Sequence, residues 1–315
     1  MTAQPSFVSP LSHGIHLIDT GFHRPAFDAS YLIVEDGRAA FVDTGTNHAV
    51  PRLLEAVRAV GLTLDDVEYV IATHVHLDHA GGVGSLMREL PRARLVVHPR
   101  GAIHLIDPRK LVQGARAVYG DDEFARSYGT IVPVPAARVI TTSDGFELTL
   151  GRRPLHFIDT PGHARHHHAI WDEASRGWFT GDTFGLSYRE FDSPRGAWLL
   201  PTTTPVQFEP EALENSVKRL MDRRPDWLYL THYGRVGEVP RLGAEFLEQL
   251  AAMVKLGHAV RGQPQRHAAL CRGLEALYAE RVARHGSPLT PVQAKELLAL
   301  DVELNAQGMG VWLDR

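Results

Sequence analysis

Residues 73–82 read Thr-His-Val-His-Leu-Asp-His-Ala-Gly-Gly and follow directly on an apolar run, Val70-Ile71-Ala72, that is typical of a buried strand. This stretch holds three imidazoles and one carboxylate: His74, His76, Asp78 and His79. Alternate side chains of an extended segment share a face, so the first three are expected to point the same way. His79 joins them only if the chain turns into a helix, which the two glycines at the end of the stretch allow.

Imidazole and carboxylate groups suit zinc, iron or manganese. Four such groups within residues 74–79 therefore predict two neighbouring metal ions that are served by one loop. The alternative is a solvated histidine-rich loop, but random loops seldom place ligand-competent side chains in this order at a strand end.

The same format, an apolar strand followed by polar residues and glycine, recurs four times. These places are Asp43-Thr44-Gly45, Thr160-Pro161-Gly162-His163, Gly181-Asp182-Thr183 and Thr231-His232-Tyr233-Gly234. Five such strand-end motifs argue against a chance pattern.

The composition is that of an ordinary globular protein. The chain has 315 residues, of which 44% are hydrophobic and 22% charged, and its net charge is -4. This charge gives no bulk attraction to nucleic acid. The start of the chain lacks a signal-peptide pattern, and no segment has the ~18 uninterrupted apolar residues of a membrane span. We therefore expect a cytoplasmic protein that acts on a small molecule, without nucleic-acid or membrane partners, and a homodimer is open.

Strand and helix patterns alternate through the first two thirds of the chain, which favours a layered α/β fold. Strands are expected within residues 14–20, 29–43, 70–72, 94–98, 138–150, 155–159, 177–181 and 227–230, and helices within 49–60, 83–90, 99–107 and 108–128. We place an Asp-Gly turn at Asp144-Gly145. Helical periodicity then covers residues 240–257, 265–285 and 291–307.

The run His74-x-His76-x-Asp78-His79 resembles the signature of the metallo-β-lactamase fold superfamily, and the Pro161-Gly162-His163 and Thr231-His232 motifs resemble its glyoxalase II-like branch. The resemblance implies a four-layer αββα sandwich. We expect it to form the catalytic domain, residues 1–239, with a helical extension, residues 240–315, packed on it.

The resemblance also implies a ligand set. The first metal ion is expected on His74, His76 and His163, the second on Asp78, His79 and His232, with Asp182 between them. Two divalent cations lower the pKa of a shared water towards neutrality. This predicts a dinuclear hydrolase of an ester, thioester or lactone that uses a metal-bridging hydroxide oriented by Asp78. Zinc is the first choice of metal, and iron or manganese stays open.

Two other functions stay open. A mononuclear-iron dioxygenase of the persulfide type is disfavoured by the joint presence of Asp78, His79 and His232. A non-catalytic binding protein on the same scaffold is disfavoured by the intact ligand set.

Several residues have two interpretations at this stage. Asp43 either supports the metal loop by hydrogen bonds or is a turn residue, and Phe22 and Phe27 either contact substrate or pack a loop. Residues 184–208, with Tyr188, Phe191, Trp198 and Thr202-Thr203-Thr204, are expected to line the pocket, although loop aromatics more often serve packing. His166, His167 and His168 are interpreted as supporting residues, and the single cysteine, Cys271, as a buried helix residue and not a nucleophile.

Overall fold

The computed structural model describes residues 5–203 and 207–315. Residues 1–4 and 204–206 lie outside the described residues, and the second group includes Thr204 of the Thr202-Thr203-Thr204 run. By internal contacts the chain forms two units. The first contains residues 1–159, 166–181 and 231–234, and the second contains residues 160–165, 182–230 and 235–315. Neither unit is continuous in sequence. The expected boundary after residue 239 stays a prediction.

The first unit contains a seven-stranded sheet with the order β1-β2-β3-β4-β5-β6-β7. Its strands are β1 (Val8–Pro10), β2 (Ile15–Asp19), β3 (Ala29–Glu35), β4 (Arg38–Val42), β5 (Val67–Ala72), β6 (Arg94–Val97) and β7 (Val139–Thr141). Strands β1 to β4 pair antiparallel and β4 to β7 pair parallel. The carboxyl ends of β4 and β5 therefore lie side by side, which brings the residues after Val42 and after Ala72 together.

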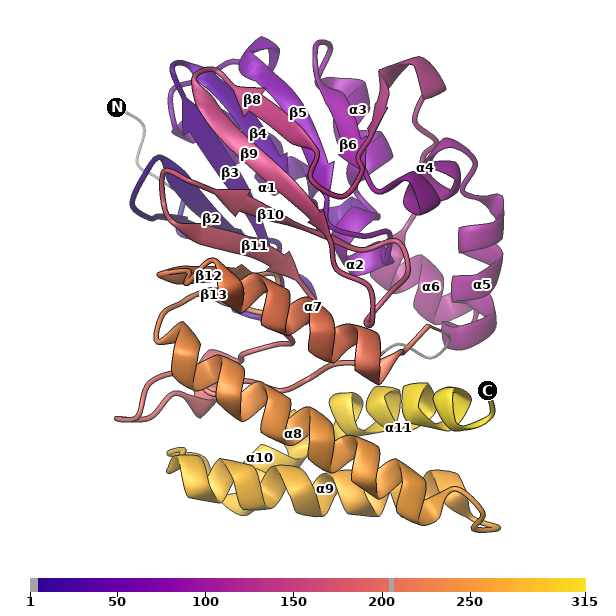
Figure 1. Ribbon diagram of the computed structural model, residues 1–315. Coiled ribbons are helices and arrows are strands. Elements are labelled where there is room, and N and C mark those ends of the chain that lie inside the picture. Colours follow the sequence, from indigo (N-terminus) through magenta and orange to yellow (C-terminus); the bar gives the residue numbers. More distant parts are fainter. Residues whose placement is uncertain (1–4, 204–206) are drawn as a thin grey trace. The chain divides into compact units, whose positions relative to one another are not determined.

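The second sheet has the order β13-β12-β11-β10-β9-β8. Its strands are β8 (Glu147–Leu150), β9 (Arg153–Asp159), β10 (His168–Asp172), β11 (Gly177–Gly181), β12 (Trp227–Leu230) and β13 (Gly234–Val236). Neighbours from β8 to β11 are antiparallel. Two sheets flanked by helices, followed by C-terminal helices, confirm the expected αββα sandwich with a helical extension (Figure 1).

The central strands β3 to β6 of the first sheet are largely buried, which explains why they are rich in apolar residues. Leu32, Val70 and Leu95 face a core that they share with Leu53 of α1 and Leu86 of α3. On the opposite face, Tyr31 of β3 meets Phe179 of β11 edge to face at 5.2 Å between ring centroids. The alternation along each strand thus divides its side chains between the helix layer and the second sheet.

The helices of the first unit are short. They are α1 (Val50–Ala59), α2 (Leu77–Ala80), α3 (Val83–Glu89), α4 (Pro99–Ile106), α5 (Arg109–Tyr119) and α6 (Asp121–Tyr128). The second unit holds α7 (Pro210–Asp222), α8 (Val239–Val260), α9 (Arg266–His285), α10 (Pro291–Leu297) and α11 (Ala299–Leu313). None of the described helices is both long and apolar enough to cross a membrane.

The expected turn at Asp144-Gly145 is present. It joins strands of different sheets, because β7 before it belongs to the first sheet and β8 after it to the second. A hairpin follows one strand later, where β8 and β9 are joined through Gly151-Arg152. The expectation of one helix over residues 291–307 was wrong, because two helices, α10 and α11, are separated at Leu298.

Candidate metal centre

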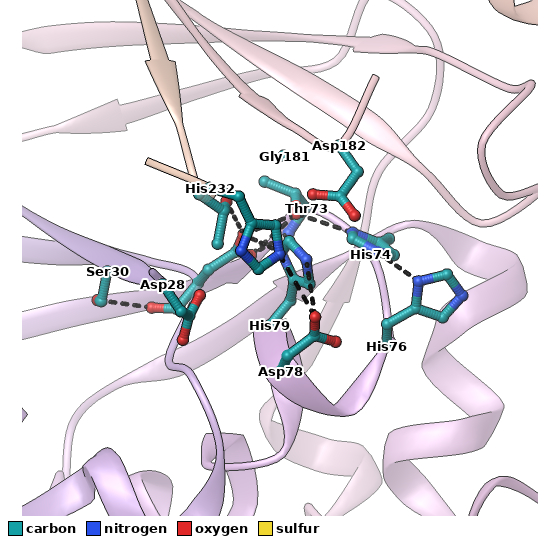
Figure 2. Close-up of polar contacts among 12 residues, drawn as sticks. Asp28, Ser30, Thr73, His74, His76, Asp78, His79, Gly181, Asp182 and His232 are labelled. Atoms are coloured by element: carbon teal, nitrogen blue, oxygen red, sulfur yellow. Dashed lines mark hydrogen bonds and ion pairs between the residues drawn. The ribbon is translucent and has the colours of Figure 1, made fainter. Parts of the chain in front are cut away.

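The central loop, residues 73–79, leaves the carboxyl end of β5 and enters the short helix α2 at Leu77. His74 and His76 therefore lie in extended chain, whereas Asp78 and His79 both lie on the helix. The expectation that Asp78 shares the extended face with the two histidines was wrong, because the helix begins one residue before it. This turn separates the four side chains into two pairs (Figure 2).

His74 and His76 form the first pair. Nε2 of His74 lies 2.8 Å from Nδ1 of His76, and their rings meet nearly perpendicular. Nδ1 of His74 lies 3.1 Å from the hydroxyl of Thr73. The His167 ring stacks on His74 at 4.8 Å, and the His166 ring contacts His76 edge to face at 5.5 Å. Both neighbours pack against the pair.

His168 turns away from these rings. Its Nδ1 lies 2.9 Å from the hydroxyl of Thr142, and its backbone N–H donates to the carbonyl of Thr73. Burial, with a smaller contribution from nearby His98, lowers the pKa of the imidazole to about 3. His168 is thus a neutral residue that connects β10 to the loop after β5.

Asp43, at the end of β4, is fully buried beneath the loop. Its carboxylate accepts hydrogen bonds from the backbone N–H of Thr73, the hydroxyls of Thr73 and Thr231, and Nδ1 of His79, at distances from 2.8 to 3.0 Å. An ionised carboxylate only accepts, so Nδ1 of His79 carries the proton. Nε2 of His79 then keeps its lone pair for a metal ion. Asp43 thereby holds the loop in place and is not a simple turn residue.

His232 is held in the same way. Its Nδ1 lies 2.9 Å from the backbone carbonyl of Phe27, which only accepts hydrogen bonds. Nδ1 therefore carries the proton, and Nε2 of His232 lies 3.4 Å from Oδ2 of Asp78. Nε2 of His79 lies 3.8 Å from the same carboxylate oxygen. Two oriented imidazole nitrogens thus face one carboxylate (Figure 2).

This group of Asp78, His79 and His232 fits a divalent cation. Its ligand atoms all lie within 4.8 Å of one another. Bonds of about 2.1 Å to a tetrahedral zinc ion require ligand atoms about 3.4 Å apart. The observed 3.4 and 3.8 Å are close to that value. Donor types, tautomers and spacing agree, so the first unit contains a metal-binding histidine and aspartate cluster.

The second unit holds His163 and Asp182. Nε2 of His163 lies 3.3 Å from Oδ2 of Asp182, and its Nδ1 lies 3.3 Å from the backbone carbonyl of Thr202. His163 therefore repeats the arrangement of His79 and His232, with Nδ1 held by an acceptor and Nε2 beside a carboxylate. Gly162 allows this turn, because its φ is +128° and a Cβ there would lie 2.2 Å from the backbone nitrogen of Leu213.

Aromatic side chains of the first unit surround the Asp78, His79 and His232 group. The Phe27 ring meets His232 at 5.5 Å, and Phe22 lies between Phe27 at 5.8 Å and Tyr128 at 5.9 Å. Tyr119 contacts Tyr128 at 5.5 Å. Burial raises the pKa of the Tyr128 hydroxyl, and the charge of Asp78 raises it further. These rings form an apolar wall beside the cluster.

The expectation that aromatics of residues 184–208 line the pocket was wrong for three of them. Tyr188, Phe191 and Trp198 are buried in the second unit. The Tyr188 hydroxyl donates to Asp301 of α11, and Phe191 packs on Trp198 at 4.9 Å between ring centroids. They form the core that anchors the C-terminal helices, while the wall near the cluster comes from residues 22–27 and from α5 and α6.

Sequence reasoning missed two kinds of supporting residue. Thr73 and Thr231 each precede a candidate ligand and donate to Asp43. The repeated Thr-His pair after an apolar strand was the available signal. Asp28 gave no signal, yet it is fully buried next to Phe27 and accepts from Thr20 at 2.6 Å. Burial raises the pKa of Asp28 to about 7.

The fold and the cluster together define a metal-binding α/β sandwich protein. A model of the metallo-beta-lactamase superfamily matches residues 17–232, and the chain belongs to this superfamily. Among curated proteins, it is 27% identical over 242 residues to the metallo-beta-lactamase fold-containing protein ST1585 of Sulfurisphaera tokodaii, which covers 75% of this chain and 84% of that protein.

A shorter match links the chain to hydroxyacylglutathione hydrolase of Xanthomonas campestris. It is 42% identical over 74 residues, which is 22% of this chain and 27% of the hydrolase. Among solved structures, ST1585 superposes with a TM-score of 0.67 at 24% identity, covering 95% of this chain and 99% of the other. TTHA1429 of Thermus thermophilus gives a TM-score of 0.65 at 21% identity, with 91% and 93% covered. At these identities the structural likeness shows the fold alone.

Proposed function

We propose that the protein is a dinuclear metal-dependent hydrolase of an ester, thioester or lactone. The observation that carries the proposal is the pairing of Nε2 of His79 and of His232 with Asp78, while the Nδ1 atoms are held by Asp43 and the Phe27 carbonyl. Such outer hydrogen bonds fix a histidine for metal binding. A histidine that only packs does not need its second nitrogen oriented towards a carboxylate.

We assign the second metal site to Asp78, His79 and His232, and the first to His74, His76 and His163 with Asp182 shared between the two. Chain connectivity supports the first assignment. Residues 160–165, which contain His163, are bounded on both sides by residues of the first unit. Asp182 directly follows Gly181, the last residue of β11. His163 therefore lies in a six-residue segment between residues of the first unit, and Asp182 is the first residue after a strand of that unit.

Divalent cations held by these residues would supply a Lewis acid for the carbonyl oxygen and lower the pKa of a bound water. The side chains of the protein would orient the attacking water molecule and exclude bulk water from the cluster. Asp78 is partly exposed between His79 and His232, where its carboxylate is able to orient a water molecule for attack. Phe22, Phe27 and Tyr128 cover this side of the cluster with apolar surface.

The aromatic wall supports the proposed substrate class. Aromatic rings favour an apolar acyl group, and the net charge of -4 gives no attraction to a polyanion. The partial match to hydroxyacylglutathione hydrolase favours a thioester within this class. We further propose zinc as the metal, a glyoxalase II-like relationship and a cytoplasmic location.

The test combines metal analysis with a substrate panel. Protein purified without added metal is analysed for zinc, iron and manganese, and is assayed on thioester, lactone, phosphodiester and persulfide substrates. Two metal equivalents at the proposed sites with thioester or lactone turnover support the proposal. One iron with oxygen consumption on a persulfide would overturn it, and so would two metals with turnover of the phosphodiester alone.

Two variants test the residues. Asp182→Ala should lose metal and activity together, because the shared carboxylate holds both ions. The matched control is Asp222→Ala, which removes an exposed carboxylate at the end of α7 in the same unit. If Asp182→Ala retains both metal ions, the assignment of Asp182 as a shared ligand is wrong. This result would leave the proposed hydrolase activity untouched.

A further inference from the structure

A second cluster of metal-ligating side chains lies on the C-terminal helices of the second unit. His267 and Cys271 are one turn apart on α9, and Glu303 faces them from α11 (Figure 1 shows the two helices). Nε2 of His267 lies 3.2 Å from Oε2 of Glu303 and 3.6 Å from Sγ of Cys271. Sγ lies 3.8 Å from the same Glu303 oxygen. The three ligand atoms thus form a compact triangle.

The dimensions of this triangle match a tetrahedral zinc site. With bonds of about 2.0–2.2 Å to nitrogen and oxygen and about 2.3 Å to sulfur, tetrahedral geometry places nitrogen and oxygen about 3.4 Å apart. It places sulfur about 3.6 Å from either atom. The observed distances are 3.2, 3.6 and 3.8 Å. One cation therefore reaches all three atoms with only small adjustments of the side chains.

The cluster is held in register by contacts on both sides of it. Nδ2 of Asn305 donates to the buried Tyr278 hydroxyl at 2.8 Å, which fixes α11 against α9. At the start of α9, Arg266 forms two hydrogen bonds to Asp314, at 2.7 and 2.8 Å. The facing positions of the two helices are therefore set without a metal.

The carboxylate of Glu303 is itself oriented. Nε2 of Gln307 donates to Oε1 of Glu303 at 2.7 Å, which directs Oε2 towards His267 and Cys271. Such an outer hydrogen bond is a regular feature of metal-binding carboxylates. The residues of the triangle are thus not merely near one another, since one of them has a partner that selects its facing oxygen.

The cluster is accessible from solvent. The side chains of His267 and Glu303 are 52% and 48% exposed, and Cys271 is partly exposed. The expectation that Cys271 is buried was therefore wrong, because its Sγ lies beside the half-exposed carboxylate of Glu303. His267 and Gln307 also line a surface hollow beside Gly310 and Asp314. A solvent molecule has room to complete four-coordination.

We propose that His267, Cys271 and Glu303 form a third metal site that binds one zinc ion, with a solvent molecule as fourth ligand. A thiolate, an imidazole and a carboxylate together select zinc over magnesium or calcium, which prefer oxygen alone. The bound ion joins α9 to α11 and stabilises the C-terminal helices. This site is independent of the proposed hydrolase function.

Cobalt(II) gives a direct test. Cobalt bound by a thiolate has a near-ultraviolet charge-transfer band, and Cys271 is the only cysteine of the chain. Metal-free full-length protein, kept reduced, is titrated with cobalt beyond saturation of all histidine sites. We expect the band to saturate at one thiolate-bound cobalt per chain and to disappear on addition of zinc.

Variants show whether all three residues bind. Cys271→Ser should abolish the band, and His267→Ala and Glu303→Gln should each weaken cobalt binding at this site at least tenfold. Glu296→Gln, an exposed glutamate on α10, is the control that leaves it unchanged. Absence of the band overturns the proposal. So does a band that keeps its affinity in His267→Ala or Glu303→Gln, or one that saturates at one cobalt for two chains.

Protection of the thiol provides a second readout. Zinc should slow the reaction of Cys271 with a chromogenic thiol reagent at least tenfold compared with protein in chelator, and Glu303→Gln should remove this protection. Equal reaction rates with zinc and with chelator in the parent protein would contradict the site. Far-ultraviolet circular dichroism of each variant verifies that α9 and α11 remain folded.

Discussion

Asp43 and Thr231 are 188 positions apart in the chain, yet the threonine hydroxyl donates a hydrogen bond of 2.8 Å to Oδ2 of the carboxylate. The same oxygen accepts from Nδ1 of His79 at 2.8 Å and from the Thr73 hydroxyl at 2.9 Å. One buried carboxylate thus links the loop after β5 to the segment that carries His232. The carboxylate orients His79 directly, and it anchors Thr231, the residue before His232.

Replacing Asp43 by asparagine should weaken metal binding by about 10- to 100-fold, as is typical for loss of an outer hydrogen bond. The amide offers only one acceptor oxygen and presents an N–H₂ group to donors that it cannot satisfy. Competition with a chromophoric chelator measures the change. Asp36→Asn, an exposed carboxylate on the β3–β4 turn, is the control. Unchanged affinity in Asp43→Asn would show that the carboxylate does not orient His79.

Gly181→Ala should destabilise the protein more than Gly145→Ala. Both glycines have positive φ, at +47° and +79°, so both alanines carry a similar backbone cost of about 1–2 kcal/mol. Only at Gly181 would the new Cβ lie 2.6 Å from both Nε2 of His167 and the Thr73 hydroxyl, whereas nothing lies within 4 Å at Gly145. Overpacking adds about 1–3 kcal/mol. Equal free energies of unfolding in urea would contradict this close approach.

Arg153→Met should cost about 3–5 kcal/mol of the free energy of unfolding, because it leaves a buried carboxylate without its partner. Arg153 donates two hydrogen bonds to Asp172, at 2.5 and 2.7 Å, and both side chains are at most 1% exposed. Its neighbour Arg152 pairs with Asp36 on the surface, so Arg152→Met should leave stability unchanged. The double variant Arg153→Met with Asp172→Leu should recover much of the loss.

His168 should make the protein acid-sensitive between pH 6.5 and about pH 3. Its pKa is about 3 in the folded chain because burial disfavours the charged imidazole, whereas the unfolded chain has the ordinary value of about 6.5. Below pH 6.5 the unfolded chain therefore binds a proton that the folded chain does not. Stability falls with decreasing pH in this window, by up to about 1.4 kcal/mol per pH unit. Denaturant unfolding of His168→Gln across the window should show a shallower slope, and a parallel curve would contradict the assignment.

Much of the fold was predictable because its signals are local. The strands are short apolar runs bounded by turn residues, and the helices from α1 to α9 follow periodic patterns with Gly or Pro at their ends. The passage of the chain from the first sheet to the second at Asp144-Gly145 was not predictable. An Asp-Gly turn has the same sequence pattern whether the two strands beside it pair with each other or belong to different sheets. The break at Leu298 carries neither Gly nor Pro.

The candidate ligands were likewise visible in the sequence as residue types at strand ends. His74, His76, Asp78 and His79 follow one strand within six positions, and His163, Asp182 and His232 repeat the format. Their grouping was less visible. Whether the Asp78 side chain lies beside His76 or beside His79 depends on where α2 begins. The sequence alone places the start of a helix only to within one or two residues.

The sequence by itself determined the family, the sandwich fold and the chemical types of the candidate ligands, because these depend on local patterns of apolar and polar residues. Only the tertiary structure decided which nitrogen of each histidine is held, since the acceptors for His79 and His232 lie 36 and 205 positions away. It also decided that His267, Cys271 and Glu303 meet, because helix packing and not sequence spacing brings α9 and α11 together.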